Sequence, residues 1–476
     1  MSELDALVLG GGISGLSIAH CLAKSGLNVE VWESSERIGG KIQTVEKQGF
    51  RLENAASMVM NFRSELDKFL QQLQLNATKD LPAPGCRRYV LNEDKLHPVP
   101  TNISGLLKTP LFSTAGKLRL LAEPLIPRGQ NPHESVADFI GRRLGPEFLE
   151  KVFEPYLAGP LASDIDLAEA SSTIPRLTAL EKNYARLSIG TLIKKLACRG
   201  SAARPQMFTF SGGMASLIQA LASQGGFRLR NNLRASEIWP VRDGWMCRAV
   251  DGDTTRTSFA RQLVVSTPAD DAANLISGLD PSLARLLETI EYAALKVIHT
   301  GFNRRDVGHT LKGSGFLVPR RSGFSANGCL WMSSLFPSHA PEDQVLFSNY
   351  LGGARNPDAA TWDEQRSLDH VMPMLKALLG VKKEPGMMHI KTHERGLPLY
   401  HGAYSQRLRA IDQKLDKLPG LYLEANYRGG VSVRDRILRA ELVAHRVVEQ
   451  VRRKKYESVS VPVFNPISAA ISGVAR

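Results

Sequence analysis

The sequence is poor in cysteine and contains no long hydrophobic run. Its 476 residues include five cysteines, scattered and without a C-x-x-C pair, at Cys21, Cys86, Cys198, Cys247 and Cys329. An odd number at this spacing argues against a disulfide framework and a zinc site, so we predict no metal and a reducing compartment. No run of about 18 apolar residues occurs, which argues against a transmembrane helix.

Acidic residues are fewer than basic ones: the sequence has 47 Asp and Glu against 60 Lys and Arg, which gives a net charge of +13. A basic balance suits nucleic acid, an anionic membrane surface or an anionic substrate. The basic residues are spread out and no nucleic-acid-binding module is visible, so we predict no nucleic-acid partner. The first expected strand begins at residue 4, and we therefore expect no signal or transit segment and a cytoplasmic location.

The stretch LVLGGGISGLSIAH at residues 7–20 has the spacing of a dinucleotide-binding turn. The apolar run over residues 4–9 predicts a buried parallel strand, directly followed by Gly10, Gly12 and Gly15. In such a turn the first glycine permits the bend, the second lets the backbone approach a pyrophosphate, and the third lets the helix pack on the strand. Ile13 and Ser14 fall in the first helical turn, where N–H groups favour phosphate.

A second predicted strand, LNVEVWE, ends on Glu33, where a carboxylate accepts hydrogen bonds from ribose hydroxyls. The segment ESSERIGGKIQT then adds a second glycine pair. The pattern G-G-G-x-x-G-L followed by E-x-x-x-R-x-G-G resembles the N-terminus of FAD-containing amine oxidases, which implies FAD rather than NAD. The residues of this segment expected to contact FAD are Glu33, Ser34, Arg37, Gly39, Gly40 and Lys41.

The order of patterns predicts an α/β protein with a Rossmann-like FAD-binding domain that is discontinuous in sequence. We assign to it residues 1–86, 205–270 and 396–455. Residues 87–100 and 271–395 are assigned to a mixed-sheet substrate-binding domain, residues 101–204 to a helical insertion, and residues 456–476 to a C-terminal tail. Within the insertion, apolar and basic residues intermingle over residues 104–125, a pattern typical either of a membrane-interface helix or of a helix that covers a core.

Motifs along nearly the whole chain resemble one branch of the same superfamily, the protoporphyrinogen oxidases. They include RRYVLNEDKLHPVP at 87–100, FTFSGGMASLIQAL at 208–221, GSGFLVP at 313–319 and PGLYLEANYRGGVSVRDRI at 419–437. The resemblance implies oxidation of protoporphyrinogen IX to protoporphyrin IX by dioxygen in haem biosynthesis, with hydrogen peroxide as the second product. It also implies peripheral membrane association through the helical insertion on the cytoplasmic face, and a homodimer, since many members are dimers.

The resemblance also suggests substrate-binding residues. Arg88 matches the arginine expected to bind a propionate, a task that suits the bidentate guanidinium, and Arg87 is the competing candidate. Gly159 falls at a family glycine beside the substrate, with a helix terminator as the alternative. Phe316 and Trp331 are expected to stack on a pyrrole ring unless they belong to the core.

At the flavin, the family positions Asn426, Gly430 and Val431 precede the last expected helix. The partial positive charge of that helix N-terminus would stabilise the reduced flavin. We name no catalytic acid–base pair, because hydride transfer to a flavin needs mostly positioning. His393 lies near the expected flavin position, but a lone histidine is more often structural.

Several residues depart from the family pattern around the flavin. Ala55 and Ala56 stand where Gly and Pro are usual, Ser163 and Ala425 each replace a glycine, and Lys41 replaces an arginine. Each added Cβ removes clearance. Two other hypotheses therefore remain: a related flavin oxidase or desaturase acting on another heterocycle or amine in secondary metabolism, and a FAD-binding protein without catalysis. One arginine does not distinguish protoporphyrinogen, with two propionates, from coproporphyrinogen, with four.

Overall fold

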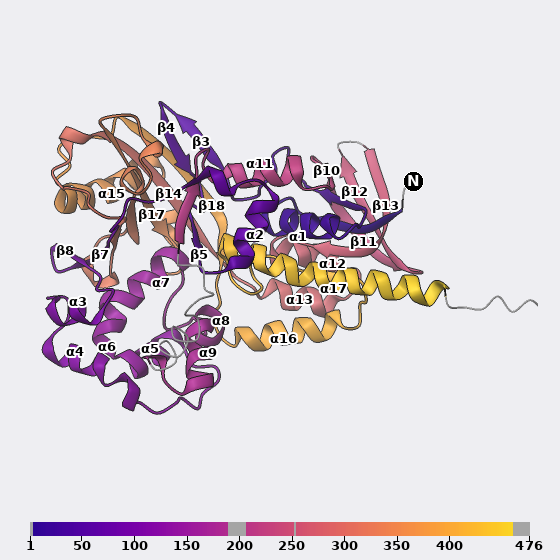
Figure 1. Cartoon of the computed structure of the whole chain (residues 1–476), viewed down its shortest axis with the longest axis horizontal. Helices are drawn as coiled ribbons and strands as arrows, with labels where there is room; N and C mark the ends of the chain where they lie inside the picture. The colour runs from indigo at the N-terminus through magenta and orange to yellow at the C-terminus, as the bar shows by residue number, and fades with distance from the viewer. Residues whose placement is uncertain (1–2, 189–205, 252–253, 460–476) are drawn as a thin grey trace, which may run out of the picture.

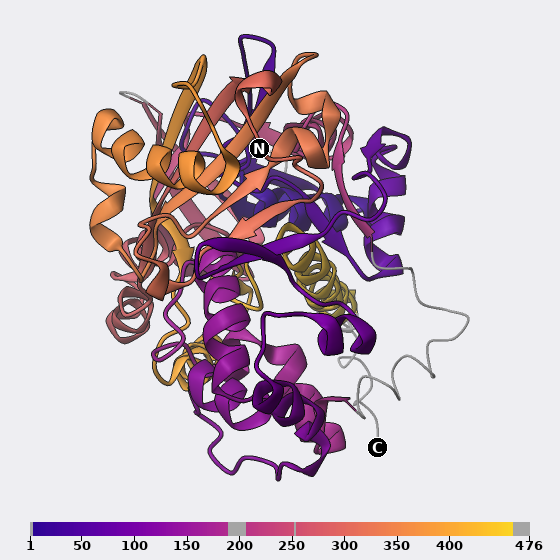
Figure 2. The same cartoon turned by 90° about the vertical axis from the view of Figure 1, so that its left-hand side faces the viewer.

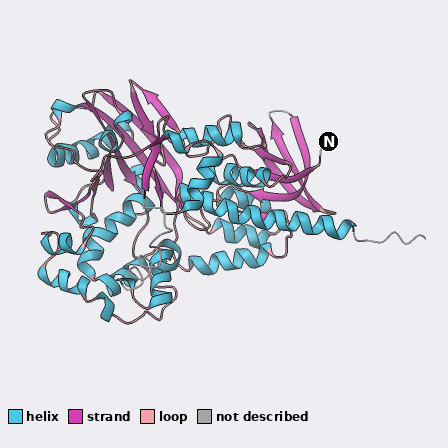
Figure 3. Cartoon of the chain, in the orientation of Figure 1, coloured by secondary structure: helices cyan, strands magenta, loops and turns pink. Residues whose placement is uncertain are grey.

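Two seven-stranded sheets and a group of helices organise the chain (Figures 1 and 3). The computed structural model describes residues 3–188, 206–251 and 254–459. The end of the predicted helical insertion (residues 189–204), which includes Cys198, and residues 460–476 of the predicted tail lie outside these residues. The mixed α/β class predicted from the sequence is confirmed.

Three separate parts of the chain build the first sheet, whose strand order is β10-β2-β1-β13-β12-β11, with β19 also paired to β13. The strands β10, β2, β1, β13 and β19 are parallel, and β11 and β12 add an antiparallel edge. The bounds are β1 Leu4–Leu9, β2 Val29–Trp32, β10 Arg228–Arg230, β11 Arg234–Val241, β12 Gly244–Asp251, β13 Thr254–Val265 and β19 Leu421–Leu423.

Helices cover both faces of this sheet because its central strands are apolar on both sides. Ala6 and Val8 of β1 pack with α1, α11 and α17, whereas Leu7 and Leu9 pack with α12, α13 and α16. The bounds are α1 Ile13–Lys24, α11 Ala215–Gln224, α12 Ala269–Ile276, α13 Pro281–Glu288, α16 Tyr404–Leu415 and α17 Val433–Val459. The helices α12 and α13 thus belong to the core of this sheet, although the predicted boundary at residue 271 gave most of them to the substrate domain.

The second sheet is mixed, with the order β18-β14-β17-β16-β15-β7-β8. Its only parallel pair among the described strands is β7 with β15, and α15 (Glu364–Leu379) packs on one of its faces. The bounds are β7 Arg88–Asn92, β8 Lys95–Pro98, β14 Tyr292–Asn303, β15 Gly315–Leu317, β16 Gly328–Trp331, β17 Gln344–Gly352 and β18 Met387–Pro398, with α14 at Met332–Leu335. Buried apolar side chains such as Ile298 and Phe347 join the sheet to α15, and each contributes about 1.5–3 kcal/mol.

Two small sheets complete the strands. One pairs β3 with β4, and the other has the order β5-β9-β6. The bounds are β3 Thr44–Lys47, β4 Phe50–Glu53, β5 Val59–Asn61, β6 Lys79–Asp80 and β9 Gln206–Phe210, and α2 spans Ser64–Gln72.

Short helices form the insertion. The insertion and α15 lie on opposite sides of the second sheet (Figure 2). Their bounds are α3 Ile103–Lys108, α4 Thr114–Leu121, α5 Val136–Leu144, α6 Pro146–Phe148, α7 Glu154–Leu161, α8 Ala170–Thr173 and α9 Pro175–Tyr184. The segment 104–125 is therefore not one amphipathic helix, because Pro110 follows the end of α3 and Ser113 caps α4. Among the described helices, none combines the length and apolar character needed to cross a bilayer.

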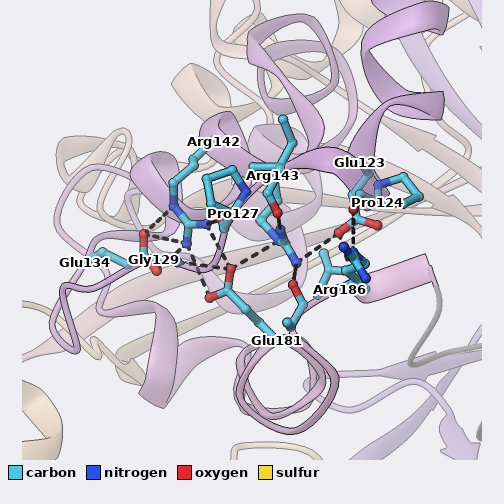
Figure 4. Close-up of polar contacts among 12 residues, drawn as sticks. Glu123, Pro124, Pro127, Gly129, Glu134, Arg142, Arg143, Glu181 and Arg186 are labelled. Carbon is cyan, nitrogen blue, oxygen red and sulfur yellow. Dashed lines mark hydrogen bonds and ion pairs between the residues drawn. The ribbon is translucent and has the colours of Figure 1, made fainter.

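An ion-pair network holds the insertion together (Figure 4). The fully buried Arg143 of α5 pairs with Glu123 at 3.1 Å and Glu181 of α9 at 3.2 Å. The neighbouring Arg142 pairs with Glu134 and Glu181, each at 2.8 Å. Removing one partner of such a buried pair costs about 3–5 kcal/mol, so the network fixes α9 against α5.

Candidate active site

Glycine is needed in the turn between β1 and α1 for two different reasons. Gly10 has a φ of +109°, and a Cβ on Gly15 would lie 2.0 Å from the carbonyl oxygen of Gly10. The helix α1 can therefore pack on the turn only without a side chain at Gly15. Beside Gly12, in contrast, nothing lies closer than 4.0 Å to the position of a Cβ. This open space allows a ligand to approach the backbone closely.

The second glycine pair lies against the same turn. The Gly39 N–H donates to the Gly11 carbonyl at 2.8 Å, and Gly39 forms an isolated bridge with Gly12. The helix α1, with Ile13 and Ser14 in its first turn, has neither a side-chain cap nor an acidic first-turn residue within the described part of the chain. Its first N–H groups thus lack side-chain partners there, as an anion site requires. Together these segments form a cradle suited to a diphosphate.

Glu33 lies at the end of β2 with its carboxylate turned toward the glycine turn. The carboxylate accepts hydrogen bonds from the Gly11 N–H at 2.7 Å and from the Ser35 N–H and hydroxyl at 2.9 and 2.7 Å, and the Ser34 hydroxyl lies 3.4 Å away. This is where a ribose hydroxyl would be bound. Arg37 donates to the carbonyls of Ile38, Gly40 and Ile42, so it fixes the shape of the second glycine segment.

Buried charges hold the loop that precedes α17. Arg436 pairs with Glu424 at 2.9 Å and donates to the carbonyls of Ala425 and Arg428. Arg439 binds the same carboxylate at 2.6 Å. The Tyr400 hydroxyl donates to the carbonyl of Asn426 at 3.0 Å. These contacts set the position of Asn426, Gly430 and Val431 at the start of the helix.

Val431 borders a small pocket between the insertion and β18. The pocket is lined by Leu161, Ser163, Thr173, Pro398, Tyr400 and Val431. Ser163, which replaces a family glycine, is hydrogen-bonded to His401 Nε2 at 2.9 Å, and burial lowers the pKa of His401. The buried hydroxyl of Thr173 has no partner among the described residues. The sequence offered no signal for His401, since only the fold brings it to Ser163.

A group of basic residues lies beside the segment with the alanine departures. His393 Nε2 donates to the Asn54 carbonyl at 2.7 Å, just before Ala55 and Ala56. Burial, followed by the charge of Arg395, lowers the pKa of Lys41 to about 8. Burial also lowers the pKa of His393, which favours the neutral ring. These contacts give His393 a structural role in anchoring the segment.

Arg88 has no ion-pair partner among the residues that the structure describes. It begins β7, opposite Gly315 of β15, and its side chain is half-buried. Its electrostatic neighbours are the phenols of Tyr156 and Tyr350 and the thiol of Cys86, with no carboxylate among the described residues. Burial lowers the pKa of Arg88, because a desolvated charge without a counter-ion is unfavourable. Arg87, the competing candidate, is exposed.

Phe316 and Trp331 point away from Arg88. The register pairs Arg88 with Gly315 and Tyr89 with Phe316, and successive side chains of a strand alternate between faces. Phe316 and Trp331 are 2% and 0% exposed and pack with Tyr89 in the core beneath α15. The structure thus corrects the expected pyrrole-stacking role of both residues and supports the core alternative.

Gly159 lies inside α7, two residues before its end, so it is not a helix terminator. A Cβ at Gly159 would lie 3.1 Å from Leu317 Cδ2, and the glycine therefore lets α7 pack closely on β15. Tyr156, one helical turn earlier, is 46% exposed and was not predicted from the sequence. The exposure of Tyr156 depends on how α7 packs against the rest of the fold, which the sequence alone does not give.

Three features of the site fit FAD: the open cradle beside Gly12, the uncapped start of α1 and the Glu33 carboxylate. Comparisons with known proteins also indicate a flavin cofactor. The family model for flavin containing amine oxidoreductase matches residues 13–448. Protoporphyrinogen oxidase 2 of Arabidopsis thaliana is 28% identical over 457 residues, with 90% of each chain covered. Coproporphyrinogen III oxidase of Bacillus subtilis is 28% identical over 451 residues, with 90% of this chain and 94% of the relative covered.

Solved structures show the same fold. A protein from Exiguobacterium sp., provisionally named a protoporphyrinogen oxidase, is 22% identical with a TM-score of 0.78, covering 94% of this chain and all of that one. Putrescine oxidase bound to putrescine is 13% identical with a TM-score of 0.68, covering 94% of this chain and 99% of that one. From the site and these matches we conclude that this chain is an FAD-dependent oxidoreductase that belongs to the flavin-containing amine oxidoreductase family.

Proposed function

We propose that this protein oxidises protoporphyrinogen IX to protoporphyrin IX in haem biosynthesis, with dioxygen as oxidant and hydrogen peroxide as the second product. The observation that carries the proposal is Arg88, a half-buried guanidinium without a carboxylate partner among the described residues. A propionate would supply the missing counter-charge through a bidentate contact. The two relatives named for porphyrinogen oxidation support the same substrate class, and this chain covers 90% and 94% of their lengths.

The chain's own residues position the reactants. Bound FAD would supply the hydride acceptor that this oxidation needs. The first turn of α17, held by Arg436 and Glu424, would offer partial positive charge to the flavin edge. Arg88 would fix the distance of the substrate from that edge, and the close packing of α7 at Gly159 would set the width available to the macrocycle. Positioning of this kind supplies much of the rate of such a reaction.

Arg88→Ala tests the proposal, with Arg87→Ala as the matched control on the adjacent, exposed residue. Loss of a charge-assisted contact of about 1.5–3 kcal/mol predicts a rise of roughly 10- to 100-fold in KM for protoporphyrinogen IX. The control should keep the KM of the wild type. Equal KM values for all three proteins would remove Arg88 from the substrate site.

The altered flavin surroundings favour one other candidate, oxidation of a different heterocycle or amine. Ser163 places a hydroxyl and its partner His401 where the family has a glycine, which narrows the pocket beside Val431. A substrate smaller than a tetrapyrrole would fit this change. Ser163→Gly distinguishes the two: it should speed porphyrinogen oxidation under our proposal and should slow turnover if the serine is part of a site for a smaller substrate.

We also propose that the insertion attaches the protein peripherally to the cytoplasmic face of a membrane. Five large apolar side chains of α3, α4 and the turn after it are 45% to 80% exposed, namely Ile103, Leu107, Leu118, Leu121 and Leu125. Basic residues such as Lys108 and Lys117 lie among them, as on an interfacial surface.

Co-sedimentation with anionic vesicles tests this attachment. The double variant Leu118→Gln, Leu125→Gln should lose binding, because each substitution removes apolar surface from the interface without adding a charge. Leu442→Gln, at a leucine of α17 with 57% exposure, is the matched control. Equal sedimentation of the two variants would contradict the proposal. A homodimer remains a prediction, for which light scattering of the purified protein is the test.

A further inference from the structure

A second group of cations lies where the insertion meets the FAD-binding part of the chain. Phe62 follows β5, and two guanidinium groups lie over its ring: that of Arg176 from α9 at 5.3 Å and that of Arg434 from α17 at 5.2 Å from the ring centre. Arg63 is the next residue and is also an electrostatic neighbour of Arg176. We call Phe62, Arg63, Arg176 and Arg434 the rim cluster.

The rim cluster carries more positive charge than its surroundings neutralise. Arg434 pairs with Asp435 at 2.7 Å and donates to the Met60 carbonyl at 2.9 Å. Asp435 is the single carboxylate among the main electrostatic neighbours of Arg176, and it is already bound to Arg434. Residues 189–205, which the structure does not describe, contain no Asp or Glu in the sequence. Like charges held together in this way favour the binding of an anion.

The position of the rim cluster relates it to Arg88. Tyr156 of α7 is an electrostatic neighbour of both Arg88 and Arg176, so the two guanidinium groups share one phenol as a neighbour. Thr173, three residues before Arg176, lines the small pocket that Val431 also borders. Tyr156 and Met60 are 46% and 45% exposed, and they add apolar surface beside the cations. Several cations beside exposed apolar surface match a flat apolar ring that carries more than one carboxylate.

We propose that Arg176 and Arg63 form a second carboxylate subsite, so that the protein binds tetrapyrroles with carboxylates on opposite edges through Arg88 and the rim cluster together. The inference rests on the proposed function, because it assumes a porphyrinogen at Arg88. Protoporphyrinogen IX has its two propionates on neighbouring rings, and Arg88 alone serves that edge. Coproporphyrinogen III has one propionate on each of its four rings, and its far edge reaches the rim cluster. No chemical step differs between the two substrates.

The test uses the holoprotein with the double variant Arg63→Gln, Arg176→Gln, and Arg242→Gln as control. Arg242 is 98% exposed on the turn after β11 and lies outside the proposed site. The first measurement is the Kd of the oxidised products coproporphyrin III and protoporphyrin IX, followed by porphyrin fluorescence. Exposed charge-assisted contacts predict a rise of roughly 5- to 20-fold in Kd for coproporphyrin III in the double variant, and less than about twofold for protoporphyrin IX.

Unchanged binding of coproporphyrin III, or an equal loss for both porphyrins, would overturn the subsite. The second measurement is oxidation of each porphyrinogen by the wild-type protein, which tests the proposed function separately. If the wild type oxidises neither but the Kd values still diverge, the proposed reaction fails and the carboxylate subsite stands. Thermal unfolding of the variants, expected at the wild-type temperature because both arginines are exposed, shows that folding is intact.

Discussion

Two glycines only three residues apart should respond to alanine in opposite ways. At Gly15 the new Cβ would lie 2.0 Å from the Gly10 carbonyl oxygen, so α1 or the turn must move. Overpacking of this kind costs about 1–3 kcal/mol, and we expect Gly15→Ala to lower the free energy of unfolding by at least that amount. At Gly12 the Cβ meets nothing closer than 4.0 Å, so Gly12→Ala should leave the FAD-free protein as stable as the wild type.

Gly12→Ala should instead weaken FAD binding, because its Cβ fills the open side of the cradle. Displacement of a phosphate from one N–H contact costs about 1.5–3 kcal/mol, or roughly 10- to 100-fold in Kd. The assay pairs urea unfolding of the FAD-free proteins with titration of FAD by fluorescence quenching. Wild-type FAD affinity in Gly12→Ala would refute the cradle, and wild-type stability in Gly15→Ala would refute the packing argument.

Three further predictions concern charged groups. Glu33→Gln should lower the FAD content retained after gel filtration, since a carboxylate binds ribose hydroxyls more strongly than an amide; full occupancy in the variant would contradict this. Because Lys41 has a pKa of about 8 in the folded chain against 10.5 as its ordinary value, the unfolded chain binds more protons between these pH values, so the contribution of Lys41 to stability rises with pH there. Urea unfolding of the FAD-free protein at about pH 7.5 and 9.5 gives the free energy of unfolding at each pH. Between these pH values that free energy should rise less, or fall more, in Lys41→Met than in the wild type. Glu424→Gln should lower the free energy of unfolding by about 3–5 kcal/mol, since it leaves the buried Arg436 without its counter-charge, whereas Asp243→Asn on an exposed pair should leave it unchanged.

The sequence predicted the elements whose residues interact locally. The glycine spacing at residues 10–15, the strand ending at Glu33 and the helix after residue 431 all follow from neighbouring residues, and the structure has each of them. The antiparallel strands β11 and β12 were not predicted. Their exposed polar residues lack the apolar run that marked β1, and β13 adds a long polar N-terminal half before its buried end.

The parts of the site that depend on contacts between distant segments were harder to predict. Phe316 was expected at the substrate because its motif matched, but which face of β15 it occupies depends on the register with β7. The pairs Ser163–His401 and Phe62–Arg176 join residues more than 100 positions apart, and no local pattern indicates them. Arg88 was predicted from its motif alone, and the lack of a counter-ion that makes it informative is a property of the fold.

The proposed oxidation itself is tested most directly without oxygen. The purified FAD-loaded protein is mixed anaerobically with protoporphyrinogen IX, and flavin absorbance is followed near ~450 nm, the usual band of this cofactor. We predict rapid bleaching of the flavin, followed by recovery of the band and release of porphyrin and hydrogen peroxide when air is admitted. A flavin that stays oxidised with protoporphyrinogen IX, while an amine or another dihydro-heterocycle bleaches it, would contradict the assignment.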